Sequence, residues 1–209
     1  MGVNSGELMF SCECDEPKVG KIIRNVYKVA FTPESLEEIY NKAKEFRTLM
    51  GWEILTYDQF LEFFITPTSN RSDPDFFKSK GICARVDDYV GIFWLTDINL
   101  QHPPHDASIH YTFFDRRTNG RLNLCRKAIE YVFDWYGFNR LWTQVPLFSK
   151  PTLKFVEDIG FRKEGRIRQN REYKGNKFDS NLYALTRDEV LMGSAWPREQ
   201  EWAQTTKPE

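Results

Sequence analysis

The stretch Ala107–Tyr136 constrains the fold more than any other part of the chain. Its first part, Ala107–Phe114, is rich in β-branched and aromatic residues, which is typical of a strand. Polar residues follow up to Gly120 and indicate a turn. Gly137, after the stretch, stands where a left-handed C-cap ends a helix. The residues before it place an apolar stripe on one helix face: Leu122, Cys125, Ile129, Val132 and Tyr136.

A strand that enters a helix through such a turn exposes the first backbone N–H groups of the helix. The helix dipole adds partial positive charge at the same place, so the turn can bind a phosphate or a pyrophosphate. An ordinary strand–turn–helix connection without a ligand explains the same residues equally well, because a single glycine is a weak signal.

The composition excludes several classes of protein. A net charge of −1 over 209 residues gives no general attraction to nucleic acid or membranes. No apolar run approaches the ~20 residues of a membrane span, and the N-terminus lacks the features of a signal peptide. We therefore expect a cytoplasmic protein with reduced thiols and no membrane partner. Cys12 and Cys14 form a C-x-C pair, but no second pair completes a zinc site, so we predict no metal.

Periodicity, caps and breakers predict the remaining elements. Helices are expected after Thr32 and Ser149, each a candidate N-cap, and after Thr56. Strands are expected at Lys21–Phe31, Gly81–Val86, Tyr89–Thr96, Arg140–Val145, Phe161–Arg168 and Lys177–Leu185. Polar connections are expected at Thr66–Lys80, Asn99–Asp106 and Gln169–Asn176.

This order predicts one α/β domain over residues 19–189, with a mixed sheet that is partly antiparallel. The strand–helix–strand unit around the central helix predicts two parallel strands joined by a right-handed crossover. Residues 1–18 are expected to be an irregular arm. The tail, residues 190–209, contains Trp196 and Trp202, which suggest a packed helix or an interface segment.

Two segments resemble motifs of the GNAT N-acyltransferases. Arg117–Leu122 is similar to the acetyl-CoA pyrophosphate loop of that family, Gln/Arg-x-x-Gly-x-Gly/Ala, with Leu122 at the last position. Val145–Phe161 is similar to the family's Asn-x-x-Ser, helix and Leu-Gly-Phe pattern, with Ser149 and Thr152 at the two polar positions. Glu164–Arg168 resembles the Glu-Gly-x-x-Arg strand of the ribosomal-protein and antibiotic acetyltransferase branch.

The resemblance implies a GNAT-like fold, in which a mostly antiparallel sheet is splayed between the parallel strands 107–114 and 140–145. It implies acetyl-CoA as co-substrate, with the pantetheine against backbone at Phe113 and Phe114. The pyrophosphate would then be bound by backbone amides of the loop, with arginines adding charge. The cofactor-binding residues implied in this way are Phe113, Phe114, Arg116, Arg117, Thr118, Asn119, Gly120, Arg121, Leu122 and Thr152.

In the family's chemistry an amine attacks the thioester directly, a general base deprotonates the amine, and a general acid protonates the departing thiolate. For the base, His110 and Asp106 are candidates, and Asp97, His102 and His105 lie in the adjoining loop. The family's acid is a tyrosine, and the nearest equivalent position here is Val156. Ser149 is the local substitute. For each histidine, a surface or core-edge role is the competing interpretation.

Three hypotheses for the function follow. The first is acetyl transfer from acetyl-CoA to a primary amine of a small molecule, a protein N-terminus or a lysine. The second is a catalytically inactive GNAT-like scaffold that forms a homo-oligomer or joins an assembly through the C-terminal tail. The third, nucleic-acid binding by the basic segment Arg162–Lys177, is the least favoured, because a solvated strand face explains those residues.

Overall fold

The computed structural model describes residues 7–16, 20–29, 32–46, 56–64, 82–87, 90–99, 103–114, 120–193 and 195. The chain forms two compact units, which are described separately. The first contains Met1–Ile98 and Ser108–Leu124, and the second contains Asn99–Ala107 and Cys125–Glu209. The described residues form eight strands and five helices, which confirms the predicted α/β class.

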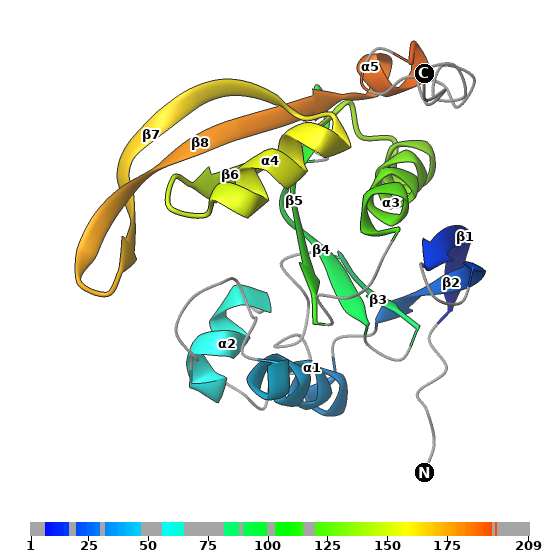
Figure 1. Cartoon of the computed structure of the whole chain (residues 1–209), viewed down its shortest axis with the longest axis horizontal. Helices are drawn as coiled ribbons and strands as arrows, with labels where there is room; N and C mark the ends of the chain where they lie inside the picture. The colour runs from blue at the N-terminus through cyan, green and yellow to red at the C-terminus, as the bar shows by residue number, and fades with distance from the viewer. Residues whose placement is uncertain are drawn as a thin grey trace, which may run out of the picture. The chain divides into compact units, whose positions relative to one another are not determined.

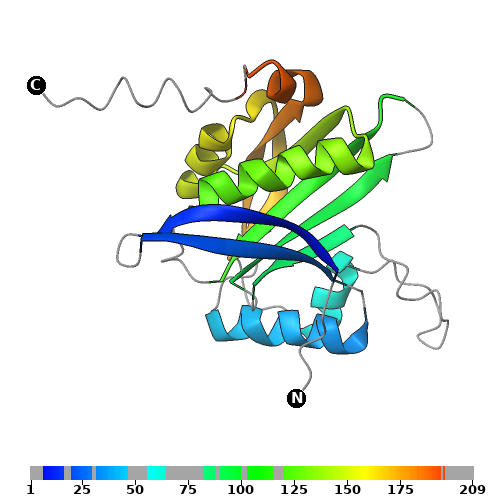
Figure 2. The ribbon, with the colours of Figure 1, turned by 90° about the vertical axis from the view of Figure 1, so that its right-hand side faces the viewer.

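The first unit is built on antiparallel strands. β1 (Leu8–Glu16), β2 (Gly20–Val29), β3 (Ile82–Val86) and β4 (Gly91–Asn99) pair in sequence order. β5 (Asp106–Phe113) lies next to β4, and β1 is the edge strand at the other end. Figure 2 shows β1 and β2 running side by side as a ribbon.

Two helices of the first unit, α1 (Pro33–Phe46) and α2 (Tyr57–Phe64), share one hydrophobic core with β2 and β4. Figure 1 shows the two helices next to each other. α1 begins at Thr32, as predicted, since the Thr32 hydroxyl accepts a hydrogen bond from the Ser35 N–H at 3.3 Å. The buried side chains of α1 pack against side chains from α2 and the sheet. The buried residues of this core are Val29, Leu36, Ile39, Ala43, Phe60, Leu61, Ile92, Trp94 and Phe114. Each buried leucine or isoleucine stabilises the fold by roughly 1.5–3 kcal/mol.

The second unit contains the order β6–β8–β7, with both pairs antiparallel. These strands span Arg140–Pro146 (β6), Arg162–Tyr173 (β7) and Asn176–Thr186 (β8). β7 and β8 form a long curved ribbon (Figure 1). α4 (Lys150–Ile159) buries Val156 and Ile159, and α5 (Arg187–Leu191) follows β8 directly.

The central stretch folds as the sequence predicts. α3 (Arg121–Tyr136) begins in the first unit and continues into the second. Cys125, Ile129 and Val132 are buried, as the apolar stripe requires. Gly137 ends the helix with φ at 68°, a conformation that glycine adopts without a steric cost.

Two predictions about the strands are wrong. Leu8–Glu16 is not part of an irregular arm, because it forms β1 and pairs with β2. Gln169–Asn176 is not a polar connection, since β7 continues to Tyr173 and β8 begins at Asn176. The actual turn is Lys174–Gly175, with positive φ at both residues (51° and 72°), as in a two-residue hairpin turn. Both strands depend on a partner strand more than on their own composition.

Other predictions fall outside the described residues. These concern the loop Thr66–Lys80 and the tryptophans Trp196 and Trp202 of the tail. The boundaries 19–189 and 190–209 stay predictions. The predicted splay between the strands of residues 107–114 and 140–145 would lie between the two units, whose relative placement is not described.

Candidate active site

The start of α3 is the described part of the predicted pyrophosphate loop. Gly120 has φ at 69°, and its carbonyl accepts the first hydrogen bond of the helix from the Leu124 N–H at 2.9 Å. The amides of Arg121 and Leu122 therefore lie in the first turn, where a helix supplies no partner for N–H groups. The predicted ligands Arg116, Arg117, Thr118 and Asn119 lie outside the described residues.

Gly120 is also required by packing on β1. An added Cβ at this glycine would lie 2.5 Å from Cβ and 2.9 Å from Sγ of Cys14. Cys14 is itself buried, with 1% of its surface exposed. The glycine is therefore explained by its positive φ and by this contact, and it is weaker evidence for a phosphate than the sequence pattern suggested.

The charge at the start of α3 is the better evidence. The first turn of α3 contains no acidic residue, whereas α1, α2 and α5 each carry one or two there. Arg121 lies in that turn instead, with its guanidinium 5.9 Å from the centroid of the Phe113 ring. Because acidic side chains normally complement the positive end of a helix dipole, this start is suited to an external anion such as a diphosphate.

The backbone at the end of β5 is only partly available to a ligand. The Phe114 N–H donates to the Val90 carbonyl at 3.0 Å, and the Phe114 side chain is buried. Successive residues of a strand direct their backbone groups to opposite sides, so the N–H and C=O of Phe113 point away from β4. Of the two predicted pantetheine contacts, Phe113 is thus the one whose backbone groups do not face β4.

His110 is held by neighbours on β4 and β5. Its Nε2 lies 3.0 Å from Oγ1 of Thr96 and 3.1 Å from Oγ of Ser108. Its ring stacks on the Trp94 ring with centroids 5.1 Å apart. The imidazole is half-buried, and its contacts fix its orientation. A general base needs such a fixed orientation toward the group from which it accepts a proton. The same contacts also suit an ordinary core-edge histidine.

Asp106, a second candidate base, is engaged by a cation. Its carboxylate lies 3.8 Å from the guanidinium of Arg140, which also pairs with Glu164. The Asp106 carboxylate is thus part of a charged cluster that links the start of β5 to β6 and β7.

The start of α4 carries two hydroxyls. Ser149 occupies the N-cap position but makes no capping bond, and its Oγ lies 2.7 Å from Oγ1 of Thr152. Val156, at the position of the family's tyrosine, is a core residue with 1% exposure. Asp106 and Ser149 belong to the second unit and His110 to the first, so the predicted catalytic residues are not placed relative to one another.

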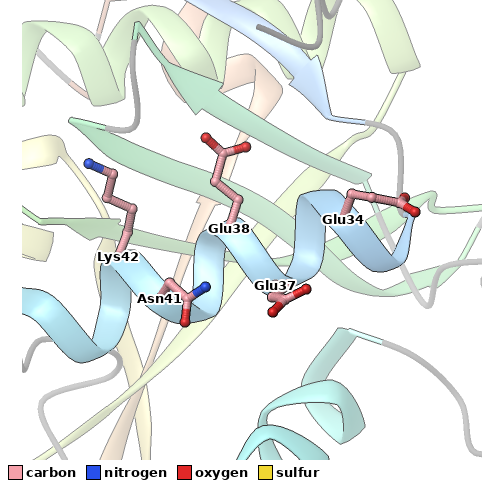
Figure 3. Close-up of a pocket in the computed structure, with 5 residues that line it drawn as sticks. All are labelled: Glu34, Glu37, Glu38, Asn41 and Lys42. Carbon is pink, nitrogen blue, oxygen red and sulfur yellow. The ribbon is translucent and has the colours of Figure 1, made fainter. Parts of the chain in front are cut away.

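An open pocket of about 350 Å³ lies along α1 (Figure 3). Its described lining consists of Glu34, Glu37, Glu38, Asn41 and Lys42. Hydrogen bonds from its own backbone N–H and from the Thr32 hydroxyl hold the pKa of Glu34 below its ordinary value, so this carboxylate is charged at neutral pH. Three carboxylates against one ammonium group favour a cationic ligand.

The comparison with known families decides the class of the protein. Residues 30–182 match the family model described as Acetyltransferase (GNAT) domain, which is well over half of the chain. This chain belongs to the GNAT acetyltransferase family. The predicted loop at α3 and the predicted segment at α4 both lie within the GNAT match, so the resemblance is confirmed at the level of the family.

Solved structures of GNAT acetyltransferases have the same fold. A chimera of the spermidine N-acetyltransferase SpeG from Vibrio cholerae and hSSAT has a TM-score of 0.62 and 17% identity, covering 79% of this chain and 98% of that one. The Vibrio cholerae enzyme in complex with CoA and spermine has a TM-score of 0.60, with the same identity and coverage. A dodecameric structure of that enzyme has a TM-score of 0.60 and 15% identity, covering 80% and 96%. No curated protein sequence matches the chain significantly.

Two arginines of the basic segment of this GNAT protein form ion pairs. Arg166 lies 2.6 Å from Asp179, and Arg162 lies 2.9 Å from Glu189. These pairs favour the solvated strand face over a nucleic-acid surface. Among the described residues, no group of three or more His, Cys, Asp or Glu side chains could hold a metal ion. No helix in that part of the chain is long and apolar enough to cross a membrane.

Sequence reasoning missed two features of the site. The carboxylates of α1 are spaced i, i+3 and i+4 in Pro-Glu-Ser-Leu-Glu-Glu, so their common face could have been read from helical periodicity. The hydroxyls of Thr96 and Ser108 around His110 had no such signal, because the contact with Thr96 depends on the pairing of β4 with β5.

Proposed function

We propose that this GNAT protein transfers an acetyl group from acetyl-CoA to a primary amine, by direct attack of the amine in a ternary complex. The observation that carries the proposal is the start of α3, inside the GNAT match, with a positive-φ glycine, an arginine and no acidic residue in its first turn. Acetyl-CoA supplies the activated acetyl group as a thioester.

The amides of Arg121 and Leu122, with the Arg121 guanidinium, hold the diphosphate of the co-substrate in this proposal. The preceding loop, with Arg116, Arg117, Thr118 and Asn119, completes the binding site, and Gly120 lets the chain turn there. Leu122 does not prevent this, because amides bind through the backbone. The backbone of Phe113 pairs with the pantetheine, and Thr152 lies at the second motif.

The proton transfers are assigned to two side chains. Nε2 of His110 accepts a proton from the attacking ammonium, directly or through water, and the Trp94 ring keeps the imidazole in place. The Ser149 hydroxyl donates a proton to the departing thiolate and regains one through Thr152 Oγ1, 2.7 Å away. The ammonium gives up two protons in all: His110 passes one to solvent, and the other is matched by the proton that Ser149 delivers to the thiolate.

The acceptor is a cationic amine. The carboxylates of Glu34, Glu37 and Glu38 attract ammonium groups, and a structural neighbour was solved in complex with CoA and spermine. A small polyamine, a protein N-terminus and a lysine share this chemistry. The resemblance of Glu164–Arg168 to the ribosomal-protein and antibiotic branch favours an acceptor of the kind used there.

Self-association is a further part of the proposal. The dodecameric neighbour and the tail with Trp196 and Trp202 support a homo-oligomer or an assembly contact. Light scattering of the full chain and of a chain that ends at residue 189 tests it. The same number of protomers per particle in both chains would show that the tail is not part of the contact.

An inactive GNAT scaffold is the competing function. Leu122 at the loop and the buried Val156 at the tyrosine position favour it. It predicts a folded protein that releases no thiol from acetyl-CoA with any amine.

Calorimetric titration with acetyl-CoA, followed by thiol release with spermidine and with a peptide bearing a free N-terminus, separates the two. We expect binding, and release with at least one amine. In the active case, His110→Phe keeps the stack on Trp94 and lowers kcat roughly hundredfold at unchanged acetyl-CoA affinity. His105→Gln is the matched control and should leave kcat unchanged. Absence of binding at millimolar acetyl-CoA would rule out the proposed acetyltransferase activity.

A further inference from the structure

Cys12 and Cys14 form a thiol pair that the proposed acetyl transfer does not use. They are two residues apart on β1, so their side chains project from the same face of the strand. Their Sγ atoms are 4.0 Å apart, and neither is in a disulfide. Cys14 is buried, whereas Cys12 is partly exposed.

A bond between them requires β1 to bend, because the two Cβ atoms of an extended strand lie about as far apart as the Cα atoms, whereas a disulfide needs them about 3.5–4.5 Å apart. At a rise of ~3.3 Å per residue, the two Cα atoms are about 6.6 Å apart, which is near the upper end of the range that a disulfide spans. The sulfurs must approach by roughly 2 Å to reach the S–S bond length of about 2.05 Å. β1 can bend to allow this, because only one of its sides is paired, with β2.

We propose that Cys12 and Cys14 are a dithiol modification site, oxidised to an internal disulfide by exchange with a small-molecule disulfide. The Cys12 thiolate attacks one sulfur of that molecule, which forms a mixed disulfide and releases one thiolate. The Cys14 thiolate then attacks the Cys12 sulfur and releases the second. The two protons lost by the cysteines end on the two released thiols, and the two electrons reduce the small disulfide.

The surroundings of the pair set the order of these steps. A hydrogen bond to Cys12, burial and the charge of Cys12 raise the pKa of Cys14, while the cation of Arg24 lowers it and Asp87 opposes Arg24. Arg24 is the partner of Cys12 in the β1–β2 register, and its guanidinium lies 3.0 Å from Asp87. Cys12 therefore reacts first, as the thiolate that attacks the small-molecule disulfide. Once Cys12 is in a mixed disulfide it carries no charge, so its charge no longer raises the pKa of Cys14, although burial still does.

The pair is mechanically connected to the start of α3. Cys14 Sγ lies 3.9 Å from the Gly120 carbonyl oxygen, which also accepts the Leu124 N–H. A Cβ on Gly120 would lie only 2.5 Å from Cys14 Cβ, so the backbone there is packed tightly on Cys14. Drawing Cys14 toward Cys12 removes this support and loosens the first turn of α3. Lower affinity for acetyl-CoA follows, a consequence that rests on the proposed function.

The experiment treats the full chain with oxidised glutathione and maps the thiols. A tryptic digest releases Met1–Lys18 as one peptide with both cysteines, while Cys83 and Cys125 fall in other peptides. We expect this peptide to lose two hydrogen atoms and to resist alkylation. The matched control, Ser11→Cys with Cys12→Ser, keeps the number of thiols but moves one to the opposite strand face. It should form only mixed disulfides.

Two further readouts separate the parts of the proposal. Amide hydrogen exchange at Leu124 needs no ligand and should accelerate severalfold in the oxidised protein. Acetyl-CoA affinity should fall about tenfold, and dithiothreitol should restore it. A Met1–Lys18 peptide with glutathione on Cys12 and no internal bond would overturn the dithiol site, whatever the ligand does. An internal bond with unchanged Leu124 exchange would overturn the connection to α3. Lack of acetyl-CoA binding by the reduced protein would instead defeat the proposed function.

Discussion

The helices of this protein begin in two different ways. At α1, Ser35 donates its N–H to the Thr32 hydroxyl at 3.3 Å, and the Ser35 hydroxyl accepts the Thr32 N–H at 3.0 Å. Glu34 adds an acidic group in the same turn. α5 begins with a capping box between Thr186 and Glu189. These starts satisfy their own N–H groups with side chains and complement the dipole.

α3 and α4 begin without such caps. Gly120 has no side chain to offer, and Arg121 places positive charge where α1 and α5 have acids. Ser149 has a suitable hydroxyl but bonds to Thr152 instead of the backbone. A missing capping bond costs about 1 kcal/mol of stability, whereas a glycine at the N-cap costs only roughly a few tenths. The two uncapped starts are also the two segments that resemble GNAT motifs, so the difference separates helix starts that support the fold from those proposed to act on ligands.

The largest expected effect concerns Gly120. Gly120→Ala introduces a side chain at positive φ and against Cys14, and it should lower the free energy of unfolding by roughly 3 kcal/mol. Gly137→Ala is the matched control, because φ is 68° there and nothing lies within 4 Å of an added Cβ. It should cost about 1 kcal/mol. Urea unfolding of both variants measures the difference, and equal losses would show that the Cys14 contact is unimportant.

The second effect concerns charge at the start of α3. Arg121→Glu creates the acidic first turn of an ordinary helix. It should weaken acetyl-CoA binding at least tenfold, by repelling the diphosphate, while the unfolding free energy stays within about 1 kcal/mol. Lys127→Glu makes the same change of charge further along α3 and should leave affinity unchanged. Calorimetry at low and high salt checks this, since the difference should shrink as salt screens the charges. Equal affinities of the two variants would remove Arg121 from the site.

The third effect compares two hydroxyls at helix starts. Ser149→Ala should lower kcat roughly tenfold to hundredfold, with little change in stability, because Ser149 does not cap its helix. Thr32→Ala should do the reverse and cost about 1 kcal/mol of stability at unchanged kcat. Turnover assays measure kcat and urea unfolding measures the unfolding free energy of each variant. A stability loss in Ser149→Ala at full activity would make α4 an ordinary helix start.

The smallest effect is the pH dependence of the α1 start. The pKa of Glu34 is lowered in the fold, so its carboxylate stabilises the native state fully above the ordinary value of 4.5. This contribution is lost as the pH falls through the lower folded pKa. Wild type should therefore be more stable than Glu34→Gln at neutral pH, and the two urea midpoints should converge as the pH falls through the lowered folded pKa. A difference that persists in acid would mean that the carboxylate acts through something other than its charge.

The sequence predicted the helices better than the contacts around them. Cys125, Ile129 and Val132 were recognised as buried because helical periodicity is written in neighbouring residues. β1 was missed because a strand at an edge is stabilised by its partner, and composition carries little of that information. The site followed the same rule. Its helix starts were predicted from local motifs, but the hydroxyls around His110 and the ion pair of Asp106 were not.

The amino-acid sequence alone determined the GNAT family, the order of most elements and the two helix starts proposed to bind and react, because these depend on residues close together in the chain. Only the tertiary structure decided why Gly120 is a glycine, since Cys14 approaches it from 106 positions away. It also decided that Arg140 forms an ion pair with Asp106. The His110 ring stacks on Trp94 and its Nε2 is hydrogen-bonded to Thr96 for the same reason. Pairing between distant strands brings these groups within contact distance, and no local pattern encodes which distant residue will arrive.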